Sequence, residues 1–302
     1  MRKTACILGV GFLLASGVIG SVPESVNIGV VSVCAQMQAS EGGTNWKNGY
    51  NAEVVAVGIG IPPQNYGVKG KVLARRAAIV DAYRNLSEEL NGVQVDSETV
   101  MENLIIKSDV VRMKTEALVK GAVIVSEQEM QDGTYKVTMK LPMYGATNSV
   151  ASVIMPAIRK QEKPVPLSEV KTTNLSEQEV KLLENDVYTG IVVDARGLGL
   201  QTTFAPVVYD TNGRVVYGLD NLDYQFAMNH GMVAYATSVE DAKSLNNRGG
   251  THPLVLKATA VRGGKNSVNK VNVVVSPEDG DRILLACRGG SILQKASVVF
   301  IK

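Results

Sequence analysis

Histidine and cysteine are scarce in this sequence, and their scarcity limits the sites that it can build. The chain has two histidines, His230 and His252, and only one cysteine, Cys287, beyond residue 34. Structural and catalytic zinc sites take three or four nitrogen, sulfur or oxygen ligands, so we expect no metal centre. A single cysteine allows no internal disulfide, and Cys287 follows an apolar run, which predicts a buried, inert thiol.

The sequence also lacks complete nucleotide-binding and hydrolase motifs. Gly58-Ile59-Gly60 begins like a dinucleotide fingerprint but continues into two prolines instead of a helix N-terminus. Gly70-Lys71 has neither the earlier glycine nor the following hydroxyl of a phosphate loop. A Gly-x-Ser-x-Gly nucleophile elbow does not occur. We therefore expect no cofactor and no enzymatic activity, although a site built from distant carboxylates stays open.

An excess of charge of one sign is missing as well. The whole chain carries a formal net charge of +2. Nucleic-acid binding needs a clustered basic surplus to neutralise phosphates. The balanced composition therefore argues against a nucleic-acid partner.

Long hydrophobic runs are confined to the N-terminus. Arg2 and Lys3 precede the apolar stretch Ala5–Ile19, which is shorter than the about 20 residues of a spanning helix. This layout is typical of a secretory signal peptide. We expect a signal peptide over residues 1–35 with cleavage after Ala35, with Ala15-Ser16-Gly17 as a second candidate site and an uncleaved anchor as the alternative. No later stretch could span a membrane, so the predicted location is the periplasm or cell envelope.

The remaining chain predicts an α+β fold with two small domains. Residues 36–49 are polar and glycine-rich, which indicates a flexible leader. For residues 50–148 we expect a β-α-β-β antiparallel sheet with one covering helix. Its helix runs from about Gly70 to Leu90, with Val72, Ile79, Tyr83, Leu86 and Leu90 on the buried face.

Three further elements complete the first predicted domain. Gln94 to Lys107 is strand-like, whereas Asp109 to Lys120 fits either a strand or a helix. The strands before and after Asp132-Gly133 predict a hairpin with a type I′ turn.

A helical and linker segment is expected over residues 149–185, followed by a second α+β domain over residues 186–302. Lys163-Pro164-Val165-Pro166 marks the linker, and Ser176 with Glu179 is a capping pattern. In the second domain, Asn212-Gly213 predicts another type I′ hairpin. Leu254 to Val261 is expected as one strand.

Asp194-Ala195-Arg196-Gly197 is the most distinctive segment of the second domain. It places opposite charges at the end of a predicted strand, beside a flexible turn. Arg196 could offer its guanidinium to an anionic ligand or partner. Alternatively, Asp194 caps the turn and pairs with Arg196. These two residues are our candidate contacts.

Val55 to Tyr144 resembles the LPP-twenty family of bacterial surface lipoproteins, which is similar to the N-terminal domain of flagellar assembly protein T. The residues that carry the resemblance are core and turn positions: Ala56-Val57-Gly58, Ala74-Arg75-Arg76-Ala77-Ala78, Asp81-Ala82-Tyr83-Arg84-Asn85-Leu86, Gly92-Val93, Gly121-Ala122-Val123-Ile124 and Asp132-Gly133-Thr134-Tyr135-Lys136-Val137. The segment from Asp194 to Tyr217 resembles the second domain of longer envelope members. The chain departs from the family at Cys34, because Val33 stands where a lipobox needs a small residue, so lipidation is not supported.

Two functional hypotheses follow. The first is an exported, non-catalytic envelope protein with a structural or assembly role, flagellar or surface-associated, whose partners are envelope proteins or further copies of itself. The alternative is an envelope ligand-binding module for a glycan or peptide, using the turn at Asp194 and Arg196.

Overall fold

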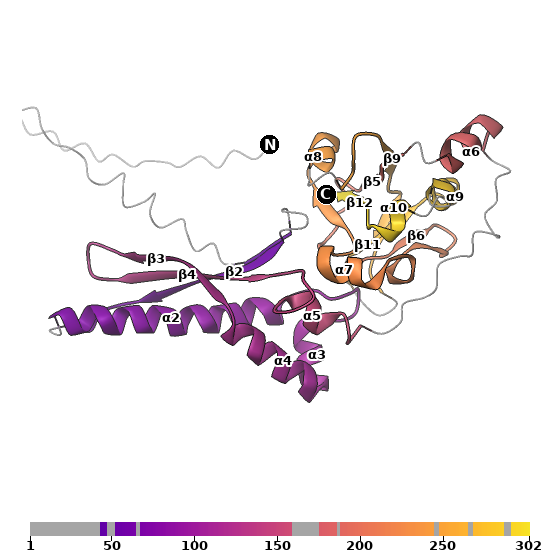
Figure 1. Cartoon of the computed structure of the whole chain (residues 1–302). Helices are drawn as coiled ribbons and strands as arrows, with labels where there is room; N and C mark the ends of the chain where they lie inside the picture. Colours follow the sequence, from indigo (N-terminus) through magenta and orange to yellow (C-terminus); the bar gives the residue numbers. More distant parts are fainter. Residues whose placement is uncertain are drawn as a thin grey trace, which may run out of the picture. The chain divides into compact units, whose positions relative to one another are not determined.

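A computed structural model describes residues 43–46, 52–64, 67–158, 175–185, 188–244, 248–264, 268–286 and 291–302. The predicted signal peptide with Cys34 and Ala35, the linker prolines and Cys287 lie outside these ranges. We call residues 43–158 the N-terminal region and residues 175–302 the C-terminal region. Both contain helices and strands, which confirms the α+β class (Figure 1).

The N-terminal region is an antiparallel four-stranded sheet in the order β1-β2-β4-β3, with helix α2 along one face (Figure 1). Its strands are β1 (Gly43–Asn45), β2 (Glu53–Gly60), β3 (Val123–Glu129) and β4 (Tyr135–Pro142). Strand β1 lies within the segment expected as a flexible leader, and it pairs with β2 from Gly43 to Asn45. The sheet therefore begins earlier than predicted.

Helix α2 (Gly67–Asn91) buries small residues against the sheet. Its buried positions recur every four residues, at Gly70, Ala74, Ala78, Ala82, Leu86 and Leu90. The predicted stripe is correct at Leu86 and Leu90 but wrong at Val72, which is 51% exposed. The reason is that β2 has glycines opposite α2, so the helix approaches too closely for branched side chains.

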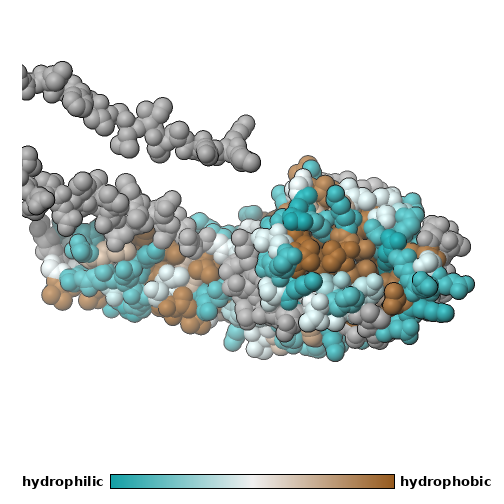
Figure 2. Space-filling view, turned by 90° about the horizontal axis from the view of Figure 1, so that it is seen from above, coloured by the Kyte–Doolittle hydropathy of each residue, from teal (hydrophilic) through white to brown (hydrophobic). Residues whose placement is uncertain are grey.

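Along the strands of this sheet, residues that face α2 alternate with residues on the opposite face, which α2 does not cover. Val137, Met139 and Leu141, which are alternate residues of β4, are buried beneath α2. On the other face, Lys136 of β4 pairs with exposed Ile59 of β2. Figure 2 shows hydrophobic and hydrophilic residues side by side on the surface seen from above.

Two short helices follow residue 94: the first lies where a strand was predicted, and the second shows that Asp109 to Lys120, which fitted either a strand or a helix, is helical. They are α3 (Met101–Lys107) and α4 (Asp109–Lys120), and a single bridge between Gln94 and Val100 is the strand-like remnant. The strand prediction for Gln94 to Lys107 is therefore wrong. Ser108 ends α3 and caps α4 by accepting the N–H of Val111. Helix α5 (Val150–Ile154) follows β4 after a loop.

Both predicted hairpins exist, but their turn type differs. The N–H of Gly133 donates to Met130 O, and the N–H of Met130 donates to Thr134 O, which closes a three-residue loop. Gly133 has a φ of +81° and Gly213 one of +84°, whereas Asp132 and Asn212 are not at positive φ. A type I′ turn needs positive φ at both central residues. Each hairpin instead uses a type I turn followed by a left-handed glycine.

The C-terminal region contains a parallel sheet in the order β8-β12-β5-β9. Its strands are β5 (Gly190–Asp194), β8 (Ala234–Ala236), β9 (Pro253–Lys257) and β12 (Val298–Ile301). All pairs within it are parallel. Strands β5, β8 and β12 are almost entirely buried, as expected for a parallel sheet.

A second, mixed sheet has the order β10-β11-β6-β7. Its strands are β6 (Val208–Asp210), β7 (Val215–Tyr217), β10 (Ala260–Arg262) and β11 (Asn272–Val275). The predicted single strand from Leu254 to Val261 is wrong, because it divides into β9 and β10. At the break, Ala258 donates to Asp194 O of β5 and Thr259 donates to Val274 O of β11. The chain thus leaves one sheet and enters the other.

Three helices of this region begin at a serine cap, and the cap at Ser176 was predicted from the sequence. They are α6 (Glu177–Glu184), α7 (Tyr224–His230), α8 (Val239–Ser244), α9 (Pro277–Ala286), α10 (Ser291–Gln294) and the 3-10 turn η3 (Leu219–Asn221). Ser176, Ser238 and Ser276 each accept a backbone N–H at the start of a helix. Helix α8 packs on β8 and β12, and α9 packs on β6 and β7.

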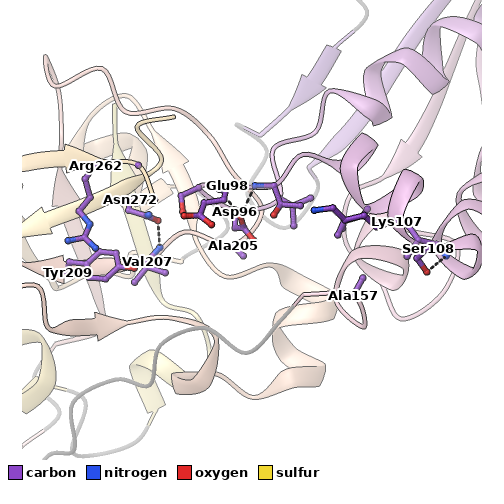
Figure 3. Close-up of a pocket in the computed structure, with 17 residues that line it drawn as sticks. Asp96, Glu98, Lys107, Ser108, Ala157, Ala205, Val207, Tyr209, Arg262 and Asn272 are labelled. Atoms are coloured by element: carbon purple, nitrogen blue, oxygen red, sulfur yellow. Dashed lines mark hydrogen bonds between the residues drawn. The ribbon is translucent and has the colours of Figure 1, made fainter. Parts of the chain in front are cut away.

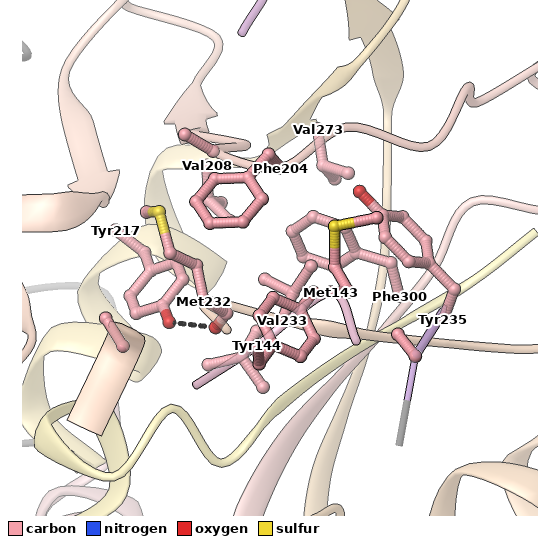
Figure 4. Packing of buried hydrophobic residues seen from close by; sticks show 14 of the residues in the cluster. Met143, Tyr144, Phe204, Val208, Tyr217, Met232, Val233, Tyr235, Val273 and Phe300 are labelled. Atoms are coloured by element: carbon pink, nitrogen blue, oxygen red, sulfur yellow. Dashed lines mark hydrogen bonds between the residues drawn. The ribbon is translucent and has the colours of Figure 1, made fainter. Parts of the chain in front are cut away.

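One hydrophobic cluster runs through both regions. Met143 and Tyr144, which follow β4, lie among Phe204, Met232 and Phe300 of the C-terminal region (Figure 4). The Tyr144 and Phe204 rings are 5.8 Å apart. Burial raises the pKa of Tyr144 to about 12, so its phenol stays neutral.

Trp46 also joins the two regions. It follows β1 and meets Tyr235 of β8 edge-on, with ring centroids 6.1 Å apart. The single tryptophan thus packs on the C-terminal region.

Candidate functional sites

The turn after β5 holds Asp194 and Arg196 as an ion pair. The carboxylate accepts the Arg196 backbone N–H at 3.1 Å, and the guanidinium donates through Nε at 2.9 Å and Nη2 at 2.6 Å. The Arg196 hydrogen bonds lower the pKa of the Asp194 carboxyl, and Asp194 raises the pKa of Arg196. The two candidate residues therefore lie together, paired with each other.

Beside this turn, a cavity of about 560 Å³ opens where three parallel strands end. We call it the carboxyl-edge cavity. Its walls come from the ends of β5, β8 and β12 and the residues after them: Ala195, Gly197, Gly199, Leu200, Tyr235, Ala236, Thr237 and Lys302. Open α/β sheets bind ligands at this edge. Asp194 and Arg196 do not line the cavity. Ala195, which lies between them in the sequence, and Gly197, which follows Arg196, do line it.

A larger cleft of about 1070 Å³ lies where the N-terminal and C-terminal regions meet. We call it the interregion cleft (Figure 3). From the N-terminal region it is lined by Val95, Asp96, Ser97, Glu98, Thr99, Leu104, Lys107, Ser108, Val111 and Ala157, and from the C-terminal region by Ala205, Val207, Tyr209, Arg262, Gly263, Gly264 and Asn272.

Backbone hydrogen bonds fix the floor of the interregion cleft. Phe204 donates its N–H to Gln94 O at 2.9 Å, and Ala205 donates to Val95 O at 2.8 Å. On one wall, the Asn272 side-chain oxygen accepts the N–H of Val207 at 2.9 Å. These bonds join segments that are far apart in the sequence, and they hold the walls of the interregion cleft in place.

Charged groups of both signs are spread across the interregion cleft. The Arg262 guanidinium lies 3.7 Å above the centre of the Tyr209 ring at one end. Lys107 lies toward the other end, and Asp96 and Glu98 lie between them in Figure 3. Asp96 uses its carboxylate to accept the N–H groups of Glu98 and Thr99. Glu98, Lys107 and Arg262 are exposed and can meet a partner's charges.

The sequence did not single out this cleft. Its acidic residues, Asp96 and Glu98, belong to a segment that was predicted as a strand. Arg262, on the opposite wall, is more than a hundred positions later in the sequence. The Asp96 and Thr99 pair resembles a capping pattern, which was the one local signal that could have marked a loop there.

The two histidines lie in separate aromatic contacts. His230 stacks on Phe226 with centroids 4.2 Å apart, and its Nδ1 is 3.1 Å from Phe226 O. His252 stacks on Tyr188 at 5.3 Å. Within the described ranges, no three histidine, cysteine, aspartate or glutamate residues gather as metal ligands would.

Comparison with known families matches part of the chain. Residues 190–302 match the model of the second domain of Treponema pallidum Tp0624. The matched segment begins with β5 and extends past β12, so it covers most of the C-terminal region and less than half of the chain. The comparison with curated proteins gave no match.

Proposed function

We propose that this protein is an exported, non-catalytic component of the bacterial cell envelope, with a structural or assembly role. In this proposal the interregion cleft holds a segment of another envelope protein. The observation that carries it is the cleft itself, formed by both regions and fixed by the backbone bonds at Gln94 and Val95. The resemblance of the N-terminal region to the LPP-twenty family supports the envelope location and a flagellar or surface-associated setting.

The size and charge of the interregion cleft favour a peptide segment over a small molecule. Its volume of about 1070 Å³ lies just above the range of roughly 300 to 1,000 Å³ that is typical of small-molecule pockets. Exposed Glu98, Lys107 and Arg262 along it can pair with side chains of both signs. Such charge complementarity sets specificity and register.

Ion pairing near the sites supports a non-catalytic role. General acid–base catalysis needs a group whose pKa lies near the working pH. Asp194 is paired with Arg196, and its pKa is lowered away from neutrality.

Charge reversal in the interregion cleft tests the proposal. We expect Glu98→Lys combined with Arg262→Glu to weaken capture of the envelope partner by about tenfold or more, since each close charge pair can contribute over 1 kcal/mol. Lys114→Glu is the matched control, because Lys114 is an exposed residue of α4 that does not line the cleft. Unchanged capture by the cleft variant would contradict the proposal.

Export is tested separately. Mass spectrometry of the mature protein should find an N-terminus at Gln36, as the signal peptide layout predicts. An intact Met1 in the envelope fraction would contradict cleavage.

The carboxyl-edge cavity favours a second candidate function, the binding of a small envelope ligand such as a glycan fragment or short peptide. A volume of about 560 Å³ and its position at the ends of parallel strands suit such a ligand. A thermal-shift screen of glycan fragments and short peptides tests it. Leu200→Trp, which would fill the cavity, should abolish any shift that the wild-type protein shows.

A further inference from the structure

The N-terminal half of α2 exposes hydrophobic side chains on the side that faces away from the sheet. Val68 is 79% exposed, Val72 51%, Leu73 42% and Val80 68%. Single exposed hydrophobic residues are common, but a cluster on one element marks an interaction surface.

Helix geometry places these residues on one ridge. Gly70, Ala74 and Ala78 are buried against the sheet. Positions two residues away are rotated by about 200°, because successive residues of an α-helix differ by about 100°. Val68, Val72, Arg76 and Val80 therefore form a row opposite the buried face. We call this row, with Lys69 and Leu73 beside it, the outer ridge.

The charged residues within the stretch of α2 that forms the outer ridge are all basic, and the nearest acid of the helix, Asp81, is paired with Arg84. Residues 67–80 contain Lys69, Lys71, Arg75 and Arg76 and no acidic residue. Lys71 and Arg75 point to the β3 side, where they pair with Glu129 and Glu127 at 2.6 Å. Lys69 and Arg76 form no ion pair with any residue in the described ranges.

We infer that the outer ridge of α2 rests on the surface of an anionic phospholipid bilayer. Its valines and leucine would enter the boundary between headgroups and acyl chains, while Lys69 and Arg76 would contact lipid phosphates. Basic side chains suit this position because their aliphatic stems lie along apolar surface and their charges stay at the headgroups.

Charge complementarity favours this occupant over a second copy of the chain. Two outer ridges packed together would bring Lys69 and Arg76 of both copies close, with no acid between them, and like charges repel. An anionic bilayer supplies the missing negative charge and a hydrophobic layer. None of the described helices combines the length and hydrophobicity of a membrane span, so the contact proposed is peripheral.

Vesicle binding by the full mature chain tests this inference. The probe is vesicles of equimolar phosphatidylglycerol and phosphatidylcholine, with pure phosphatidylcholine as the neutral comparison. We expect the wild-type protein to sediment with the anionic vesicles only, and added salt to weaken binding, because the attraction to anionic lipid is electrostatic. Binding to both kinds of vesicle alike, or to neither, would overturn the inference.

Two variants separate the hydrophobic and the charged contribution. Val72→Glu with Val80→Glu, and Lys69→Glu with Arg76→Glu, should each weaken vesicle binding by about tenfold or more. Val268→Glu is the matched control, since Val268 is 92% exposed and lies far along the chain from α2. All substituted positions are exposed, so circular dichroism should show an unchanged fold.

Other occupants would give other results. If light scattering shows a dimer that Val72→Glu with Val80→Glu dissociates, the ridge binds a second copy and the inference is wrong. It is equally wrong if both ridge variants bind anionic vesicles as the wild-type protein does.

Discussion

At Gly58 and Gly60 of β2, the backbone of the N-terminal sheet lies directly against the backbone of α2. A Cβ atom built on Gly58 would lie 2.1 Å from Ala78 O, and one on Gly60 would lie 1.9 Å from Ala74 O. The helix therefore packs directly on the strand. The Gly-x-Gly pattern that begins like a nucleotide-binding motif has this structural cause.

Gly58→Ala should destabilise the protein by about 2 kcal/mol or more, because α2 must move to admit a methyl group. Gly92→Ala is the matched control, since a Cβ there would meet no atom closer than 3.6 Å. Denaturant unfolding measures both. Equal midpoints for the two variants would contradict the close packing.

Arg196→Gln tests the ion pair at the end of β5. Arg196 lowers the pKa of Asp194, so its removal should raise that pKa toward the ordinary aspartate value, as followed by NMR titration. A carboxyl with a depressed pKa stabilises the fold above its unfolded pKa, and this is lost as pH falls through the folded pKa. The stability difference between wild type and variant should therefore vanish in acid. An unchanged Asp194 titration would show that the pair does not persist in solution.

The hairpin of β6 and β7 depends on a left-handed backbone conformation at one residue. Gly213 has a φ of +84°, and no heavy atom lies within 4 Å of a Cβ built there. The guanidinium of Arg214, the next residue, forms an ion pair with the Asp281 carboxylate of α9 at 3.0 Å. This ion pair attaches the turn to a helix.

Gly213→Val should therefore destabilise by about 1 kcal/mol or more, because a β-branched residue is strained at positive φ. Gly213→Asn should reduce the stability much less, since asparagine tolerates this conformation. Thermal unfolding of the two variants compares them. If the valine variant and the asparagine variant have the same unfolding temperature, the left-handed turn is not formed.

Local patterns predicted those elements that local residues determine. Asp132-Gly133 predicted the hairpin of β3 and β4, and the capping pattern of Ser176 with Glu179 predicted the start of α6. The patterns failed where contacts with residues distant in the sequence determine the structure. The break between β9 and β10 depends on β5 and β11, and the buried face of α2 depends on glycines in β2. Asp194 and Arg196 were predicted as a pair in one of two readings, whereas neither cavity was visible, because each joins segments distant in the sequence.

For the whole molecule, the shared hydrophobic cluster predicts cooperative unfolding of the two regions. Trp46 reports on it, because it is the only tryptophan and it contacts Tyr235 of the C-terminal region. Denaturant unfolding followed by Trp46 fluorescence should coincide with unfolding followed by circular dichroism. Two separate midpoints would show that the regions unfold independently and that the cleft between them is not rigid.

The most direct measurement of the proposed function is site-specific photo-crosslinking in living cells. A photoreactive phenylalanine analogue replaces Glu98 inside the interregion cleft and, in a control, Met113, which is exposed on α4 outside it. We predict that position 98 crosslinks to one discrete envelope protein and that position 113 does not. No adduct at position 98, or the same adducts at both positions, would contradict the proposal that this cleft holds a partner segment.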